Sequence, residues 1–345
     1  MAEYVYVFNK DSLIVKPPKK SPLLLRMIAL LFGMVCGILI CSIRLKHMST
    51  GAKFKYQNTD IDIELSELPG RSGTNQLEVH RLHYPEPQTF SRAECKHNPV
   101  RLFAIISMQR SGSGWFETLL NSHINVSSNG EIFSKLDQRR NISSIIDTLD
   151  KVYNLDWLTS ASKNECSAAV GFKWMLNQGL MEHHREIVEY FNHKGVSAIF
   201  LFRRNLLRRM VSVLANSYDR YAKLLNGIHK SHVHSPQEAK TLSSYKPTIN
   251  STSLLVDLKV VESTATQALE YFNNARHIVL YYEDLVKNPS KVRDVLEFLR
   301  LPQMELTSRQ VKIHKGSLSE LIQNWDEVNR TLHGTVYENF LNADY

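Results

Sequence analysis

Cysteine is scarce in this chain of 345 residues, which contains four. Cys36 and Cys41 lie in the most apolar stretch, where a thiol behaves as a small hydrophobic side chain. Cys95 and Cys166 lie outside it and are too few for a disulfide framework or a cysteine-ligated zinc site. They allow at most one disulfide with each other, in an oxidising compartment.

Long hydrophobic runs and charge of one sign are also limited. Only residues 27–43 form an uncharged apolar run, which excludes a transporter with several membrane spans. The net charge of +8 comes from 42 basic and 34 acidic residues and is spread along the chain. A duplex-binding protein needs basic residues clustered on one face, so no nucleic-acid partner is expected. The mild basic excess suits an anionic ligand.

The single apolar run predicts a membrane anchor. At ~1.5 Å per residue, residues 27–43 span about 26 Å as a helix, enough for a thin bilayer. The side chain of Arg26 can reach the interface and extend the span to residues 23–43. A signal peptide would start closer to Met1 and end at small residues. Residues 1–22 are therefore predicted to be a cytosolic tail, with everything beyond the span in a lumen.

The lumenal part divides at about residue 99. Residues 44–98 have no sustained apolar period and contain several Pro and Gly, which predicts a stem. Residues 99–345 form the predicted main domain. Four N-x-[S/T] sequons agree with a lumenal glycoprotein; they begin at Asn125, Asn141, Asn250 and Asn329.

Short apolar runs alternate with helical patterns in the main domain. The predicted strands are residues 102–107, 168–175, 196–202 and 277–281. The predicted helices are residues 115–122, 180–192, 206–225, 254–273 and 289–299. This alternation predicts an α/β fold, a three-layer parallel sheet with helices on both faces. Such sheets bind ligands at the carboxyl ends of their strands.

A glycine-rich loop, residues 109–115, follows the first predicted strand and precedes a helix. Two glycines allow a tight turn whose amides, with the helix N-terminus, form an anion site. The loop resembles a phosphate-binding P-loop but lacks the G-x-x-x-x-G-K-[S/T] lysine, and Trp115 stands where a nucleotide triphosphatase needs its magnesium-binding hydroxyl. The alternative is an ordinary Gly/Ser turn.

A second basic motif follows the strand at residues 196–202. Arg203, Arg204 and Asn205 stand at its end, and Ser212 comes eight residues after Arg204. Two arginines there indicate an anionic partner, because unpaired buried charge is unfavourable. The alternative is a solvated basic face.

Together the two motifs resemble those of the sulfotransferases that use 3′-phosphoadenosine 5′-phosphosulfate (PAPS). The first motif is matched by Arg110, Ser111, Gly112, Ser113, Gly114 and Trp115. The resemblance implies that this loop holds the 5′-phosphosulfate and that Arg204 and Ser212 hold the 3′-phosphate. The R-S-G-S form is similar to the carbohydrate and nodulation-factor branch, and the layout resembles Golgi type II members, in particular a plant group.

The same resemblance implies the remaining site residues. Lys315 and Gly316 resemble the segment that closes over the donor. Carbohydrate-modifying members place a general-base Glu about 21 residues after the first-loop Arg, and Glu131 has this spacing from Arg110. Arg110 would stabilise the leaving phosphate. No metal is implied.

The sequence therefore predicts a PAPS-dependent sulfotransferase acting on a hydroxyl of a glycan or glycosylated acceptor in the Golgi membrane. The alternatives are a non-catalytic glycan- or nucleotide-binding protein of the same fold, and a P-loop kinase. Lys173 is a weaker candidate, since a strand-end lysine is usually solvated. Residues 227–250, which include three histidines, are predicted to be a flexible loop beside the acceptor cleft.

Overall fold

The computed structural model describes residues 8–9, 12–13, 82–158 and 166–342. The chain divides into two compact units, Met1–Asn75 and Gln76–Tyr345. In the first unit, β1 (Phe8–Asn9) pairs antiparallel with β2 (Ser12–Leu13). The predicted membrane span, residues 23–43, lies outside the described residues, and within them no helix combines the length and apolarity needed to cross a bilayer.

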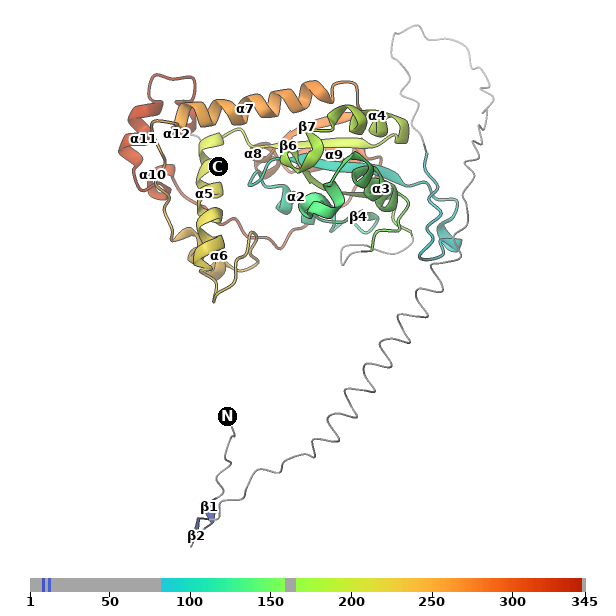
Figure 1. Ribbon diagram of the computed structural model, residues 1–345, viewed down its shortest axis with the longest axis horizontal. Helices are drawn as coiled ribbons and strands as arrows, with labels where there is room; N and C mark the ends of the chain where they lie inside the picture. Colours follow the sequence, from blue (N-terminus) through green and yellow to red (C-terminus); the bar gives the residue numbers. More distant parts are fainter. Residues whose placement is uncertain (1–7, 10–11, 14–81, 159–165, 343–345) are drawn as a thin grey trace. The chain divides into compact units, whose positions relative to one another are not determined.

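The second unit is built on a five-stranded parallel sheet with the order β4-β5-β3-β6-β7 (Figure 1). Its strands are β3 (Arg101–Ser107), β4 (Val126–Ser128), β5 (Ala169–Met175), β6 (Ser197–Phe202) and β7 (His277–Tyr281). From β3 the chain runs to the edge strand β4, returns inward to β5 beside β3, and then crosses to β6 and β7 on the other side of β3. The carboxyl end of β3 is therefore the switch point of the sheet, where α/β proteins bind ligands.

Helices cover both faces of this sheet, as predicted. Leu102, Ala104 and Ile106 of β3 face α3, α4 and α7, whereas Phe103 and Ile105 face α2, α8 and α9. This alternation with period two gives each strand two apolar faces, which explains the continuous apolar runs in the sequence.

The helix bounds follow in chain order. The helices are α2 (Ser113–Leu120), α3 (Ile142–Tyr153), α4 (His184–Lys194), α5 (Leu206–Ala222), α6 (Pro236–Ser243), α7 (Leu254–Tyr271), α8 (Tyr282–Lys287), α9 (Ser290–Phe298), α10 (Leu318–Leu321), α11 (Trp325–Leu332) and α12 (Asn339–Asn342). Short helical turns are η1 (Ala93–Cys95), η2 (Ile132–Ser134), η3 (Leu136–Arg139) and η4 (Leu176–Leu180).

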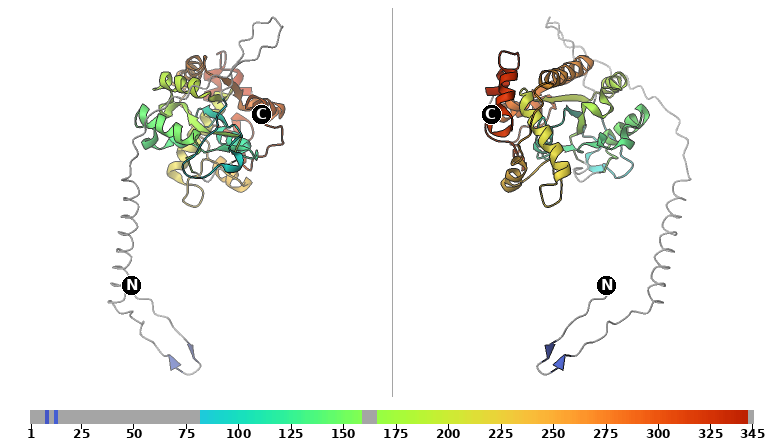
Figure 2. Two further views of the ribbon diagram at one scale, coloured as in Figure 1. Left: turned by 90° about the vertical axis from the view of Figure 1, so that its right-hand side faces the viewer. Right: turned by 60° about the vertical axis from the view of Figure 1, so that its left-hand side comes forward.

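The C-terminal helices gather around α5 rather than over the sheet. Leu207 and Val211 of α5 pack in one apolar cluster with residues of α7, α10, α11 and α12. Figures 1 and 2 show α5 and the red C-terminal helices side by side at one end of the unit. This cluster anchors α5, the helix that carries the second basic motif.

One sequence prediction about the fold is wrong. The polar segment at residues 227–250, predicted to be a flexible loop, contains helix α6. Its start carries ordinary helix signals: the Ser235 hydroxyl accepts a hydrogen bond from the Glu238 amide at 3.2 Å, and Pro236 occupies the first turn. Polarity concealed these signals, because α6 buries only Ala239 and Leu242.

Cys95 and Cys166 form a disulfide, with their Cα atoms 5.3 Å apart. The bridge ties the segment before the sheet to the start of β5. The same segment is held by Asp156, whose carboxylate accepts hydrogen bonds from the amides of Gln88 and Thr89 at 2.7 and 3.0 Å. Residues 82–98 therefore pack against the sheet-bearing unit.

Breaking this disulfide should destabilise the fold. The bridge closes a sequence separation of 71 residues, and a loop of that length stabilises the native state by about 2–5 kcal/mol. Cys166→Ser should lower the melting temperature by roughly 5–15 °C in a thermal scan. Dithiothreitol should lower the wild-type melting temperature and leave a Cys95→Ser/Cys166→Ser variant unchanged. Equal effects of dithiothreitol on both proteins would contradict this assignment.

Candidate active site

The predicted anion-binding loop lies at the switch point, between β3 and α2. Gly112 has φ 90°, and a Cβ there would lie 2.3 Å from the Tyr282 ring. A Cβ on Gly114 would lie 2.4 Å from the His232 ring. Both glycines are therefore needed for close approach, and Gly112 also for its left-handed backbone.

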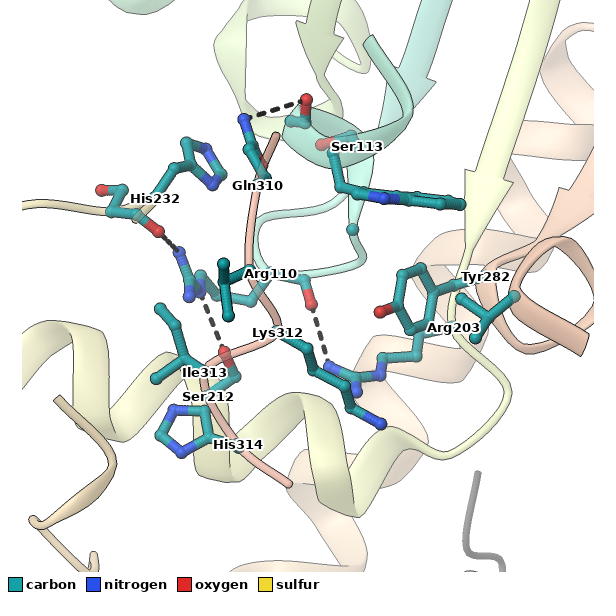
Figure 3. Close-up of a pocket in the computed structure, with 16 residues that line it drawn as sticks. Arg110, Ser113, Arg203, Ser212, His232, Tyr282, Gln310, Lys312, Ile313 and His314 are labelled. Atoms are coloured by element: carbon teal, nitrogen blue, oxygen red, sulfur yellow. Dashed lines mark hydrogen bonds between the residues drawn. The ribbon is translucent and has the colours of Figure 1, made fainter. Parts of the chain in front are cut away.

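A pocket of about 280 Å³ opens at this loop (Figure 3). Its wall is made by the glycine loop, α5 with the turn before it, α8, the segment before α6, and residues 310–314. Residues 310–314, which precede α10, are called the strap below. The lining residues are Arg110, Gly112, Ser113, Gly114, Trp115, Arg203, Ser212, Ser231, His232, Tyr282, Val286, Gln310, Val311, Lys312, Ile313 and His314. The first motif and Ser212 of the second motif thus share one cavity, whereas the lining does not include Ser111, Glu131, Arg204, Lys315 or Gly316.

Arg110 joins the two motifs directly. Its Nε donates to Ser212 Oγ at 2.9 Å, and one terminal nitrogen donates to the Ser231 carbonyl at 2.6 Å (Figure 3). Burial, followed by the charge of Arg203, lowers the pKa of Arg110 to about 10. A buried guanidinium beside a second one is a favourable site for an anion.

The two consecutive arginines of the second motif lie in different places. Arg203 enters the pocket, where it donates to the Arg110 carbonyl at 3.3 Å and lies 5.2 Å from the Tyr282 ring centroid. Arg204 pairs with Asp284, and this hydrogen bond is the main cause that raises its pKa. The Arg204 side chain is 51% exposed. Adjacent side chains at the end of a strand point to opposite faces of the sheet. Arg203 and Arg204 therefore reach different partners although they are neighbours in the sequence.

Glu283, in the first turn of α8, holds the same turn. Its carboxylate accepts hydrogen bonds from the Arg204 and Asn205 amides at 3.0 and 3.2 Å. Asn205 in turn caps α5 by accepting from the Arg208 amide at 2.9 Å. Glu283 therefore orients the start of α5, a structural role.

The strap that precedes α10 forms the outer wall. The Gln310 side chain donates to the Gly114 carbonyl at 3.3 Å. Burial, followed by the charges of nearby arginines, lowers the pKa of His314 to about 4, and its Nδ1 has no hydrogen-bond partner among the described residues. An unpartnered buried nitrogen among arginines indicates a ligand-binding position. Gly316 lies next to this wall, where its carbonyl accepts from Arg208 at 2.8 Å.

Lys312 on this strap should make anion binding depend on pH. Burial, followed by the charges of neighbouring basic residues, lowers the pKa of Lys312 to about 8; these neighbours are Arg208, Arg203 and Lys315. Below pH 8 the ammonium is present, and above it the charge is lost. The affinity for an anionic probe such as adenosine 3′,5′-bisphosphate (PAP) should therefore fall roughly tenfold between pH 7 and 9. Phosphates are already doubly charged there, since their second pKa is ~6.

Calorimetric titration across this pH range measures the effect. Lys312→Arg should keep wild-type affinity at pH 7 and lose the decline, because arginine stays charged. A wild-type affinity that does not change through pH 8 would contradict the prediction.

Glu131 lies beside the pocket rather than in its lining. Gln178 donates to Glu131 Oε1 at 2.5 Å, and Lys173 Nζ lies 3.4 Å from Glu131 Oε2. Lys173 is buried, with 7% of its surface exposed, so the solvated position expected for it is wrong. The pKa of His232 is lowered to about 4 by desolvation of its ring, then by Arg110 and Lys173. His232 itself lines the pocket.

The family assignment follows from the sequence match. Residues 102–325 match the model of the sulfotransferase domain, which is well over half of the chain. The chain belongs to the sulfotransferase family. This assignment leaves the kinase alternative without support. Among the residues placed in the structure, no group of three or more His, Cys, Asp or Glu side chains could hold a metal ion.

Individual relatives are more distant. The chain is 25% identical over 251 residues to nodulation protein H of Rhizobium meliloti, covering 70% of this chain and 95% of the relative. It is also similar to the crystal structure of a sulfotransferase from Alicyclobacillus acidocaldarius, with a TM-score of 0.37 and 14% identity, over 71% of this chain and 97% of the other. A mouse sulfotransferase complexed with PAP gives a TM-score of 0.34 and 12% identity, over 67% and 64% of the two chains.

Sequence reasoning missed several pocket residues. The resemblance assigns the 3′-phosphate to Arg204 rather than to Arg203, and the sequence motifs do not include Gln310 or His314. The signal that pointed to Arg203 was its place directly after a strand, which it shares with Arg204.

Proposed function

We propose that this sulfotransferase moves a sulfuryl group from PAPS to a hydroxyl of a glycan or glycosylated acceptor. The observation that carries the proposal is the pocket at the end of β3, where a glycine loop, a helix N-terminus and several basic side chains converge. Its volume is close to the lower end of the ~300–1,000 Å³ typical of small-molecule sites.

The donor chemistry suits this pocket. The 5′-phosphosulfate carries negative charge that the loop amides and the Arg110 guanidinium can bind. The 3′-phosphate is assigned to Ser212 and Arg204, the latter after release from Asp284, with Arg203 and Lys312 adding positive charge. The loop amides and Arg110, which hold the 5′-phosphosulfate, stabilise the charge that develops on the 5′-phosphate as it leaves.

Glu131 is assigned as the general base. The acceptor oxygen attacks sulfur, the bond from sulfur to the phosphate oxygen breaks, and the acceptor proton passes to Glu131 while PAP leaves. A sugar hydroxyl is a weak nucleophile, so removing its proton as the bond forms is the main requirement. The Glu131 side chain is 33% exposed, so an acceptor hydroxyl can reach its carboxylate. The buried Lys173 ammonium beside it holds the carboxylate in place.

The compartment is proposed as the Golgi lumen, with the catalytic unit held by a single type II span at residues 23–43. The Cys95–Cys166 disulfide supports an oxidising compartment. A protease added to intact microsomes should spare residues beyond the span, and digestion there without detergent would contradict this topology.

Calorimetry on the full chain in mild detergent tests the donor. Micromolar binding of PAP with little binding of ATP–magnesium is expected. Binding of ATP–magnesium alone would contradict the donor assignment. Turnover is then measured by transfer of radioactive sulfate from PAPS to a mixture of N-acetylchitotetraose, galactotetraose and cellotetraose. Binding of PAP without turnover of any hydroxyl acceptor would favour the non-catalytic alternative.

The 3′-phosphate assignment makes its own prediction. Arg204→Ala should weaken PAP about tenfold or more, and adenosine 5′-phosphate hardly at all, because only PAP carries the 3′-phosphate. Ser212→Ala should weaken PAP by a larger factor than adenosine 5′-phosphate, which loses only the support that Ser212 gives to Arg110. Arg203→Ala should weaken both nucleotides, since its guanidinium lies against the Arg110 carbonyl of the loop. Equal losses for both nucleotides in Ser212→Ala would contradict the assignment.

A further inference from the structure

Glu117 is a buried carboxylate on α2 that the proposed donor chemistry does not use. It lies one helical turn beyond Ser113, where α2 begins at the donor loop, and 7% of its surface is exposed. Burying a carboxylate is unfavourable by several kcal/mol unless it is paired and hydrogen-bonded. Its partners therefore indicate what it does.

One oxygen of Glu117 holds the segment that leads to Glu131. Oε1 accepts a hydrogen bond from Ser128 Oγ at 2.7 Å and from the Gly130 amide at 3.0 Å. Gly130 has φ 78° and directly precedes Glu131. The Gly130 carbonyl in turn accepts from the Lys173 amide at 2.9 Å, so this segment is held from both α2 and β5.

The other oxygen of Glu117 faces Lys173. Oε2 lies 3.7 Å from Lys173 Nζ, and the same ammonium lies 3.4 Å from Glu131 Oε2. One buried ammonium thus stands between two carboxylates. The Glu117 and Lys173 side chains are each 9% exposed, whereas that of Glu131 is 33% exposed. The Glu131 carboxylate is therefore accessible to solvent, and the Glu117 carboxylate is not.

We propose that Glu117 is a positioning residue that sets Glu131 and Lys173 at a fixed distance from the donor loop. The donor loop ends where α2 begins, and Glu117 fastens the middle of α2 to the Gly130 amide and to Lys173. The distance between donor and base is therefore set by one turn of rigid helix. The proposal rests on the proposed function, in which Glu131 is the base.

Glu117→Gln tests the charge, and Glu117→Ala tests the anchor. Glutamine keeps the shape and an oxygen for the Gly130 amide, and removes the charge that faces Lys173. Glu117→Gln should lower kcat on the order of 10–10²-fold, since a misplacement of about 1 Å is enough for such a loss. The dissociation constant for PAP should change by less than threefold. The exposed Glu186→Gln on α4 is the matched control and should match the wild type.

A double-mutant cycle in the full chain separates positioning from general destabilisation. In a Glu131→Gln background, Glu117→Gln should lower kcat by less than twofold more, because the group that it positions is already lost. In Glu117→Ala, amide hydrogen exchange of residues 126–133 should rise at least tenfold, while exchange of residues 108–112 stays at the wild-type rate.

The outcomes distinguish the two proposals. A wild type that binds no PAP overturns the proposed function, and hydrogen exchange in Glu117→Ala then decides the anchoring by itself. A wild type that turns over the glycan mixture while Glu117→Gln keeps its kcat overturns the positioning role alone. Losses that multiply in the double mutant, or unchanged exchange in Glu117→Ala, also overturn it. If Glu117→Gln does not fold, Glu117→Asp replaces it, with the same expected dependence on Glu131.

Discussion

Glu131→Gln should lower the rate of sulfuryl transfer on the order of 10²–10⁴-fold while leaving PAP binding nearly intact. The amide cannot accept the acceptor proton, which is what a general base contributes to the rate. Glutamine keeps the size of the side chain and an oxygen for the Gln178 hydrogen bond. Binding should persist because Glu131 is not part of the pocket lining.

The measurement is kcat with PAPS and the glycan mixture, together with the dissociation constant for PAP. Glu186→Gln on the exposed side of α4 is the control for loss of a carboxylate. An unchanged kcat in Glu131→Gln would remove Glu131 from the mechanism. A large loss of PAP binding would instead place Glu131 in the donor site.

Arg110→Ala should lower kcat/KM on the order of 10²–10³-fold. This side chain lies in the loop at the N-terminus of α2, and loss of one such stabilising donor has an effect of this size. The variant also removes the hydrogen bonds to Ser212 and to the Ser231 carbonyl, which hold the pocket wall together. PAP binding should therefore weaken as well.

Arg110→Lys separates charge from geometry. Lysine keeps the positive charge but cannot reproduce two divergent hydrogen bonds from one planar group, so an intermediate loss of about tenfold is expected. Arg220→Ala, at an exposed position on α5, is the control for loss of an arginine. An Arg110→Ala variant with wild-type kcat/KM would contradict the assignment of this loop to the donor.

The elements with continuous apolar patterns were predictable from the sequence. The strands β3, β5, β6 and β7 agree with their predicted ranges to within one residue, because their apolar runs are continuous. Both faces of β3, β5 and β6 are buried, whereas most residues of the edge strand β7 are half-buried. The short edge strand β4 and helix α3 gave no such signal, although Asn141 caps α3 by accepting from the Ser144 amide at 2.9 Å.

The candidate site also has features that were predictable from the sequence and features that were not. The position of the glycine loop was predictable, because Gly112 and Gly114 are needed where the Tyr282 and His232 rings approach the backbone. The distribution of roles between Arg203 and Arg204 was not predictable, since it depends on which of two adjacent side chains meets Tyr282 and which meets Asp284.

The sequence by itself determined the α/β class, the glycine loop after β3 and the sulfotransferase family, because these depend on local periodicity and on motifs within a few residues. Only the tertiary structure decided which side chains of the site contact one another. Arg110 contacts Ser212 across 102 positions of the chain, and Gln178 contacts Glu131 across 47. Lys173 lies buried between Glu117 and Glu131 only because α2 and the end of β4 pack on β5. Such distances are set by the packing of helices on the sheet, for which a linear sequence carries no direct pattern.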